Sequence, residues 1–340
     1  QAMRAENDTT RATTERLVEV AERLGSPEHR LRAANTRGQT ALYEGKYREA
    51  GDTLQAAIAD WETFSGKSSG SAYGPDPVMA AYANHGLALW FLGYPDSARH
   101  SYRKALSVAQ EAGLPFTLAA AHAHVAFVEL LCGNAAEAFR LADQGLALAA
   151  EHAFPFWRAV ATAFRGGAQM HLGKTAAGVE DVRAAIALFD SSGLKFTKPL
   201  LLALLAGGGL RLGKLREGLE SVDEGLHLTH TTLDRFYEPE LWRLKGELLL
   251  AQSKEKKRAA RSTNRSAQVT EAEQCFQHAV KIAREWGARS LELRGAMSLA
   301  RLEQIAGARG AARDLLAAVN GGFTEGFDTR DLQEARVLSG

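Results

Sequence analysis

Small and apolar residues recur along the chain at helical spacing, and the pattern breaks at regularly placed glycines. Gly93, Gly133, Gly173 and Gly213 follow one another at intervals of 40 residues. Blocks of this kind between such breaks predict pairs of antiparallel helices joined by short turns. First helices are expected over about 29–44, 77–92, 116–132, 156–172, 196–212, 235–252 and 288–306. Second helices are expected over about 47–63, 95–112, 135–152, 175–192, 215–231, 269–286 and 309–320.

The frame extends beyond these four glycines in both directions. Gly45 precedes Gly93 by 48 residues, which is one period plus an insertion in a stretch rich in Gly, Ser and Pro. Gly307 follows Gly213 by 94 residues, which is two periods plus 14. The sixth turn is therefore expected near Ser253, with the extra residues directly after it.

Small residues stand seven places before and five places after most of the turn glycines, for example Gly86 and Ala98 around Gly93. Because a glycine inside a helix costs up to about 1 kcal/mol, such residues indicate closely approaching helices. A second set of glycines half a period later predicts left-handed caps at the ends of the second helices. It comprises Gly25, Gly113, Gly193 and Gly287.

The predicted fold is all-α, a solenoid of about seven helical hairpins with a period near 40 residues. Residues 26–327 form the array, with turns at Gly45, Gly93, Gly133, Gly173, Gly213, Ser253 and Gly307. Residues 4–25 are expected to be the second helix of a truncated repeat, and 328–340 a capping helix. Residues 1–3 look like an expression remnant, and the chain is expected to come from a longer protein.

Composition agrees with a helical protein that buries a core, because 46% of the 340 residues are hydrophobic and only eight are proline. The net charge of +1 gives no field that would steer nucleic acid or an anionic membrane. Cys132 and Cys275 fall in apolar helical segments, which suits a reducing compartment. No secretory signal or membrane span is predicted, so a cytoplasmic location is expected.

The segment Gly38-x6-Gly45-Lys46-Tyr47-Arg48-Glu49-Ala50, followed by Ala57, resembles the tetratricopeptide repeat signature. The resemblance extends over nearly the whole chain, although the period exceeds the usual 34 residues or so. It implies a right-handed superhelical array with the first helices on the concave side.

The last third of the chain resembles a more specific group. The residues Glu271-Ala272-Glu273, Gly287-Ala288-Arg289-Ser290, Ser298-Leu299-Ala300-Arg301-Leu302 and Phe323-Thr324-Glu325-Gly326-Phe327-Asp328 carry this likeness. They are similar to the C-terminal repeats of bacterial signalling proteins that contain AAA/STAND ATPase modules and either class III nucleotide cyclase or LuxR-type DNA-binding domains. The resemblance implies a regulatory or sensory domain of such a protein.

One stretch raises the question of nucleotide binding. Gly208 to Lys214 spell G-x-x-x-x-G-K, as in a phosphate-binding loop, but Leu215 stands where a hydroxyl is needed to meet magnesium. The same frame recurs at other turns without lysine, which favours a helix–helix turn. His227 and His230 share a helix face without a third ligand, and His122 and His124 do not share a face. The sequence thus predicts no catalytic, cofactor-binding or metal-binding residues.

The concave groove is the preferred candidate site, because the family places residues 13, 10, 6 and 3 before each turn glycine along it. These positions predict an apolar trough with charged ends, suited to an amphipathic helix, a peptide or a small ligand. Whether the trough is open, or closed as core by tight winding, is left undecided by the sequence. The candidate residues are Ala83, Leu87, Trp90, Ala123, Phe127, Leu130, Ala163, Met170, Ala203, Leu210, Arg243, Glu247, Arg294 and Arg301.

The predicted function is a non-catalytic interaction or sensor module of a larger bacterial signalling or transcriptional-regulatory ATPase. The partner would be a protein, a peptide, a small ligand or another domain of the same chain. An alternative is an oligomerisation scaffold of a multidomain cyclase, with the repeats forming a homo-oligomer. A weaker alternative is nucleic-acid contact through the basic insertion 254–265, which lacks aromatic residues for base stacking.

Overall fold

A computed structural model describes residues 2–64, 74–193, 197–232, 234–258, 265–306 and 310–339. These residues form sixteen α-helices, fourteen of which pair as seven antiparallel hairpins. The hairpins are α2 (Pro27–Tyr43) with α3 (Tyr47–Glu62), α4 (Pro77–Leu92) with α5 (Pro95–Ala112), α6 (Pro115–Leu131) with α7 (Ala135–Glu151), α8 (Pro155–His171) with α9 (Thr175–Ser191), α10 (Lys198–Leu212) with α11 (Leu215–Thr231), α12 (Glu238–Arg258) with α13 (Arg265–Glu285), and α14 (Arg289–Ala306) with α15 (Ala311–Gly321). Helix α1 (Ala2–Leu24) precedes the first hairpin, and α16 (Arg330–Ser339) follows the last.

The turn glycines have the left-handed backbone conformation that ends a helix and redirects the chain. Gly45, Gly93, Gly133, Gly173 and Gly213 have φ between 70° and 93°. At Gly93 the next amide, of Tyr94, donates to the carbonyl of Leu89, which satisfies one of the last carbonyls of α4. Proline then stands at the first position of several following helices, where its missing N–H costs nothing, as at Pro95 of α5.

The helices stack in two layers, and small residues set the distance between them. The first helices of consecutive hairpins, α2, α4, α6, α8, α10, α12 and α14, contact one another and form the inner layer. Within a hairpin the approach is close: a Cβ on Gly166 of α8 would come within 2.5 Å of the carbonyl oxygen of Gly178 in α9. The structure therefore confirms an all-α solenoid of stacked antiparallel helix pairs.

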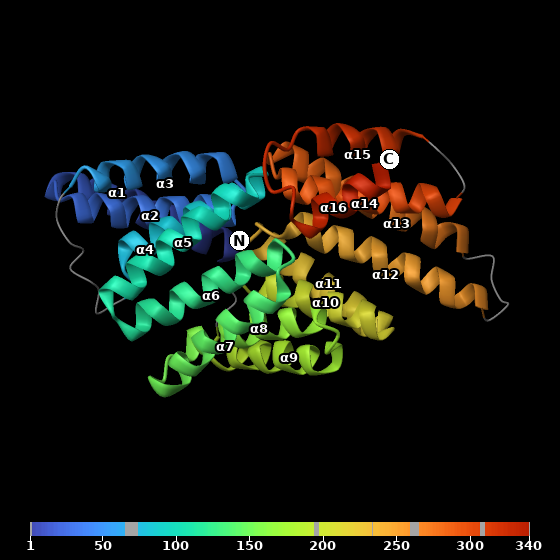
Figure 1. The fold of residues 1–340 in the computed structure, drawn as a ribbon, viewed down its shortest axis with the longest axis horizontal. Helices are drawn as coiled ribbons and strands as arrows, with labels where there is room; N and C mark the ends of the chain where they lie inside the picture. Colours follow the sequence, from blue (N-terminus) through green and yellow to red (C-terminus); the bar gives the residue numbers. More distant parts are fainter. Residues whose placement is uncertain are drawn as a thin grey trace.

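The array curves until its last hairpins return to its first ones. Figure 1 shows α1–α5 at one end, α6–α11 below, and α12–α16 beside the turns of the early hairpins. The Ser290 hydroxyl donates to the carbonyl of Trp90 (2.6 Å), so α14 and α4 are joined across 200 residues of sequence. The Tyr47 hydroxyl likewise donates to the carbonyl of Phe236 (2.6 Å). Consequently the concave side is largely enclosed.

The structure departs from the expected repeat frame at its sixth turn. Ser253 lies inside α12, which continues to Arg258, so the expected turn at Ser253 is wrong. The run Lys-Glu-Lys-Lys-Arg has high helix propensity and extends the helix past the position where the repeat frame places a glycine. Gly307 lies outside the described residues, as does the central part of the basic insertion. No helix in the described part of the chain is long and apolar enough to cross a membrane.

Candidate functional site

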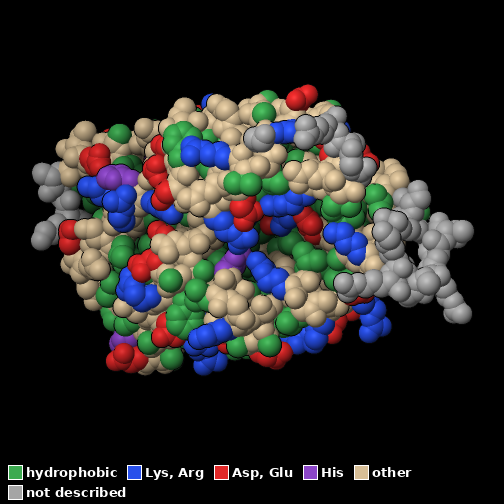
Figure 2. Space-filling model, turned by 45° about the vertical axis from the view of Figure 1, so that its right-hand side comes forward, with side chains coloured by type: hydrophobic (Ala, Val, Ile, Leu, Met, Phe, Trp, Pro, Cys, Tyr) green, Lys and Arg blue, Asp and Glu red, His purple; other side chains and the backbone are tan. Residues whose placement is uncertain are grey.

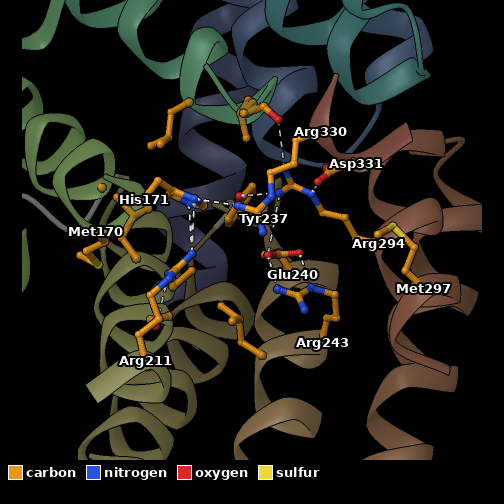
Figure 3. A pocket seen from close by; sticks show the side chains of 18 of the residues that line it. Met170, His171, Arg211, Tyr237, Glu240, Arg243, Arg294, Met297, Arg330 and Asp331 are labelled. Atoms are coloured by element: carbon orange, nitrogen blue, oxygen red, sulfur yellow. Dashed lines mark hydrogen bonds and ion pairs between the residues drawn. The ribbon is translucent and has the colours of Figure 1, made fainter. Parts of the chain in front are cut away.

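A pocket of about 320 Å³ lies on the inner layer in the C-terminal half of the array (Figure 3). Helices α6, α8, α10, α12, α14 and α16 all contribute to its walls. The apolar part of the lining includes Phe127, Leu130, Met170, Leu204 and Met297. Its charged and polar part consists of His171, Arg211, Tyr237, Glu240, Arg243, Arg294, Arg301, Arg330, Asp331 and Glu334.

Half of the candidate groove residues line this pocket. They are Phe127, Leu130, Met170, Ala203, Arg243, Arg294 and Arg301. Glu247 lies next to it, where it accepts hydrogen bonds from Ser298 (2.7 Å) and Arg243 (3.4 Å).

The other candidates belong to the packed part of the inner layer. Ala83, Ala123 and Ala163 are fully buried, and Leu87 and Leu210 are half-buried against the core. Trp90 is only 2% exposed, because the guanidinium of Arg294 covers its ring at 5.0 Å from the centroid. At these positions the expected trough is thus closed by packing, and it opens at the pocket.

Most arginines of the pocket are held by carboxylates from the same wall. Arg243 binds Glu240 through two nitrogens (2.8 and 2.9 Å), and Arg294 binds Asp331 (2.6 Å). Burial alone would raise the pKa of Glu240, but Arg243 and Arg294 outweigh it and the pKa is lowered. Arg301 binds Glu334 at 2.7 Å, which ties α14 to α16. These three arginines therefore stabilise the closed form of the array.

Arg294 has the largest share in this closure. Besides Asp331 it donates to the carbonyl of Leu131 at the end of α6 (3.1 Å) and to the Tyr237 hydroxyl (3.3 Å). One side chain of α14 therefore connects α6, the start of α12 and α16.

The opposite wall, on α8 and α10, carries two nitrogen-bearing side chains, His171 and Arg211, without a carboxylate partner in the described residues. Arg211, on the last turn of α10, makes no ion pair among the described residues, and its guanidinium lies 3.3 Å from Nε2 of His171. Arg330 of α16 donates to Nδ1 of His171 (2.9 Å) and pairs with Glu334 through its Nε (2.8 Å). The enclosing protein, followed by the charges of Arg211 and Arg330, lowers the pKa of His171 to about 4.

The space-filling view shows a hollow near the middle of one face with basic, acidic and histidine side chains around it (Figure 2). The lining as a whole contains five arginines and three carboxylates. One lining glycine helps to leave this space, because a Cβ on Gly207 would meet only the flexible Nη1 of Arg211, at 3.5 Å. The arrangement can hold a small ligand, or part of a peptide, that combines apolar and negatively charged groups.

His171, Arg211 and Arg330 were missed by the sequence analysis, although a periodic pattern contains two of them. The position two residues before the turn glycine is Phe91, Leu131, His171 and Arg211 in four successive repeats. It changes from apolar to basic at the hairpins that line the pocket. Arg330 could not have been found this way, because α16 lies outside the repeat frame.

The phosphate-loop-like stretch is a helix end and a turn. Gly207, Gly208 and Gly209 lie within α10, and Gly213 is its left-handed cap. Gly209 packs against the backbone of Gly218 in α11, where a Cβ would lie 3.2 Å from its Cα. Lys214 is 47% exposed and its ammonium lies 3.7 Å from Glu217. This geometry offers no cradle of free amides before a helix N-terminus.

Residues 80–111, which form most of the α4–α5 hairpin, match the family described as Tetratricopeptide repeat. The chain contains a tetratricopeptide repeat. The fold of stacked helix pairs described above is that of a tetratricopeptide solenoid. A comparison with curated proteins gives no match.

Solved structures share this fold at low sequence identity. A Rap protein complexed with Competence and Sporulation Factor has a TM-score of 0.57 and 14% identity, over 92% of this chain and 72% of that chain. Aspartyl phosphate phosphatase F from Bacillus subtilis has a TM-score of 0.56, also at 14% identity, over 92% and 72%. The APC/C hetero-tetramer Cut9-Hcn1 has a TM-score of 0.55 and 14% identity, over 95% and 51%. These similarities concern the fold alone.

Proposed function

We propose that this tetratricopeptide chain is a non-catalytic sensor module that binds a peptide or a small ligand in its central pocket. The observation that carries the proposal is the pocket itself, about 320 Å³ in volume and lined by apolar side chains together with a guanidinium that packing does not use. That volume lies within the roughly 300–1,000 Å³ of typical ligand sites. Structural arginines would be expected to have carboxylate partners, and Arg211 has none in the described part of the chain.

The similarity to a Rap protein supports a peptide as one form of the ligand. That protein, which has the same fold, was solved in complex with Competence and Sporulation Factor. The repeats of this chain resemble those of bacterial AAA/STAND signalling ATPases, so the regulated output would belong to other domains of a larger protein. We place the site in the open pocket, because the rest of the inner layer is occupied by buried alanines and by Trp90.

The position of the pocket suggests how binding would be transmitted. One wall consists of α8 and α10, and the other of α12, α14 and α16. A ligand that contacts both walls would favour one spacing between them and hence one curvature of the array. Domains attached to the array would respond to that curvature.

The test is to select binding peptides and then to fill the pocket. Peptides selected from a random display library against the wild-type chain are measured again with the variant Gly207→Leu. This side chain enters the pocket, where only the flexible end of Arg211 stands in its way. We expect the dissociation constant to rise at least about tenfold, which corresponds to about 1.4 kcal/mol.

A matched control uses the same substitution elsewhere. Gly321, at the end of α15, has nothing within 4 Å of an added Cβ and does not line the pocket. Gly321→Leu should leave the affinity of the selected peptides unchanged. If they bind Gly207→Leu as tightly as the wild type, the pocket is not the binding site and the proposal fails.

A further inference from the structure

The proposed function leaves open which chemical group the pocket recognises, and a cluster of nitrogen-bearing side chains at one end of the pocket supplies an answer. Resting on that function, we infer that Arg211, Arg330 and His171 bind an oxyanion, a carboxylate or phosphate group, at one end of an otherwise apolar ligand. His171 and Arg211 come from the neighbouring inner-layer helices α8 and α10, and Arg330 comes from α16, 159 residues after His171 in the sequence (Figure 3).

The geometry brings three nitrogen-bearing groups to one place. Nη1 of Arg330 lies 2.9 Å from Nδ1 of His171, and Nη2 of Arg211 lies 3.4 Å from the same atom and 3.3 Å from Nε2. All three side chains are exposed toward the pocket rather than packed in the core. A ligand entering the pocket would therefore meet them without any rearrangement of the helices.

The hydrogen bonds that these groups already make show which of them is free to bind a ligand. Arg330 uses Nε for Glu334 and Nη1 for His171, while Arg211 contacts only His171 and, weakly, the carbonyl of Gly207 (3.4 Å). No carboxylate in the described part of the chain lies within 4 Å of the Arg211 guanidinium. Several N–H donors of the Arg211 guanidinium are therefore available to an acceptor on another molecule.

The electrostatics favour a negatively charged acceptor. The protein that encloses the pocket, and then the charges of Arg330 and Arg243, lower the pKa of Arg211. This guanidinium therefore lies among like charges. The charge of Glu240 acts in the opposite direction on this pKa, but both oxygens of Glu240 are already bonded to Arg243. An oxyanion bound by two guanidinium groups would offset this repulsion and form charge-assisted hydrogen bonds.

The remaining lining determines the rest of the ligand. Phe127, Leu130, Met170, Leu204 and Met297 face the same space and offer no hydrogen bonds. A molecule that fits both parts has one oxyanion and an apolar body of a few carbon atoms. The terminal carboxylate of an apolar peptide and an alkyl phosphate share this chemistry.

The test measures three six-carbon probes by isothermal titration at constant ionic strength: hexanoate, monohexyl phosphate and the neutral 1-hexanol. We expect at least one of the anions to bind at least about tenfold more tightly than 1-hexanol. The anion that binds more tightly identifies whether the site prefers a carboxylate or a phosphate.

Three variants assign the effect to the proposed residues. Arg211→Gln should remove the anion preference and leave the affinity for 1-hexanol unchanged, whereas Arg211→Lys should retain part of it. Arg216→Gln, at a side chain that is 86% exposed on α11, changes the net charge by the same amount and should have no effect. Histidine NMR provides a second readout, because a bound anion should raise the pKa of His171 from about 4.

The outcomes separate this inference from the proposed function. If 1-hexanol binds as tightly as both anions, and Gly207→Leu abolishes that binding, the pocket binds ligands but the oxyanion site is wrong. If Arg211→Gln leaves the anion preference intact, the assignment of the residues is wrong. If none of the three probes binds, the oxyanion inference is overturned, while the proposed function is decided by the selected peptides and Gly207→Leu.

Discussion

The two walls of the pocket carry similar side chains but use them differently. On α12 and α14, Arg243, Arg294 and Arg301 each bind a carboxylate, so we call this the paired wall. On α8 and α10, His171 and Arg211 face the pocket without a carboxylate in the described residues, and we call this the unpaired wall. The same residue type therefore stabilises the fold on one wall and is available to a ligand on the other. Substitutions on the two walls should have effects of very different size.

The largest effect is expected for Arg294→Met on the paired wall. The variant leaves Asp331 without its partner, removes donors from the Leu131 carbonyl and the Tyr237 hydroxyl, and uncovers the ring of Trp90. Breaking such an enclosed network by removing one member costs about 3–5 kcal/mol of unfolding free energy. Urea unfolding followed by circular dichroism measures this loss.

The matched control is Arg216→Met, at an arginine of α11 that is 86% exposed, and it should change stability by less than about 0.5 kcal/mol. A loss below about 1 kcal/mol for Arg294→Met would contradict a structural role of the paired wall.

A smaller effect is expected for Glu240→Gln. An amide keeps the shape and can still accept one hydrogen bond from Arg243, but the charge-assisted pair is lost. We expect a loss of about 2 kcal/mol at pH 7. The folded-state pKa of Glu240 is lowered below its usual value, so its contribution is present above about pH 4.5 and disappears as the pH falls through that folded pKa. The wild type and the variant should therefore converge in stability at low pH, and a constant difference down to pH 3 would be incompatible with this role.

The unpaired wall should affect the stability of the chain in a higher pH range. The pKa of His171 is about 4 in the folded chain against a usual 6.5, so the unfolded chain binds the proton first as the pH falls. Stability should consequently decrease between about pH 6.5 and pH 4, and His171→Gln should reduce that decrease by about 1 kcal/mol, a value discounted because the imidazole is exposed. Thermal unfolding of both proteins at several pH values between 7 and 4 measures the difference. Parallel curves would show that the folded chain does not resist protonation of His171.

The smallest effect is expected for Arg211→Gln. Because this guanidinium has no carboxylate partner among the residues that the structure describes and lies among like charges, its loss should change the free energy of unfolding by no more than about 0.5 kcal/mol, in either direction. Differential scanning calorimetry without added ligand gives the value. A loss of 2 kcal/mol or more would place Arg211 with the structural arginines and remove the distinction between the walls.

The repeat frame could be predicted because it depends on local chemistry. Gly93 and Gly133 have the left-handed conformation that redirects the chain between two helices. Small residues such as Gly166 recur where two helices approach closely. Each of these requirements shows in the sequence at a fixed spacing. The helix boundaries were accordingly predicted to within a few residues over most of the chain.

The pocket could be predicted only in part, because it depends on how far the array curves. The frame placed Met170 and Arg243 on the concave side, where the structure has them lining the pocket. It also placed Ala83, Ala123 and Trp90 there, but the alanines are buried in the core, and the return of α14 to α4 covers Trp90. The spacing of residues within one repeat does not predict a contact between residues 200 positions apart. For the same reason it could not predict that Arg330 contacts His171.

The contact between α4 and α14 also bears on how such a protein can evolve. Open repeat arrays gain or lose units by duplication and deletion with little cost, since each unit touches only its neighbours. Here Ser290 reaches the carbonyl of Trp90, and Arg294 reaches that of Leu131, only when the intervening hairpins bring the chain round by the correct amount. Removal or duplication of one internal hairpin would move these partners apart. The number of hairpins between α4 and α14 is therefore fixed by the geometry of the array.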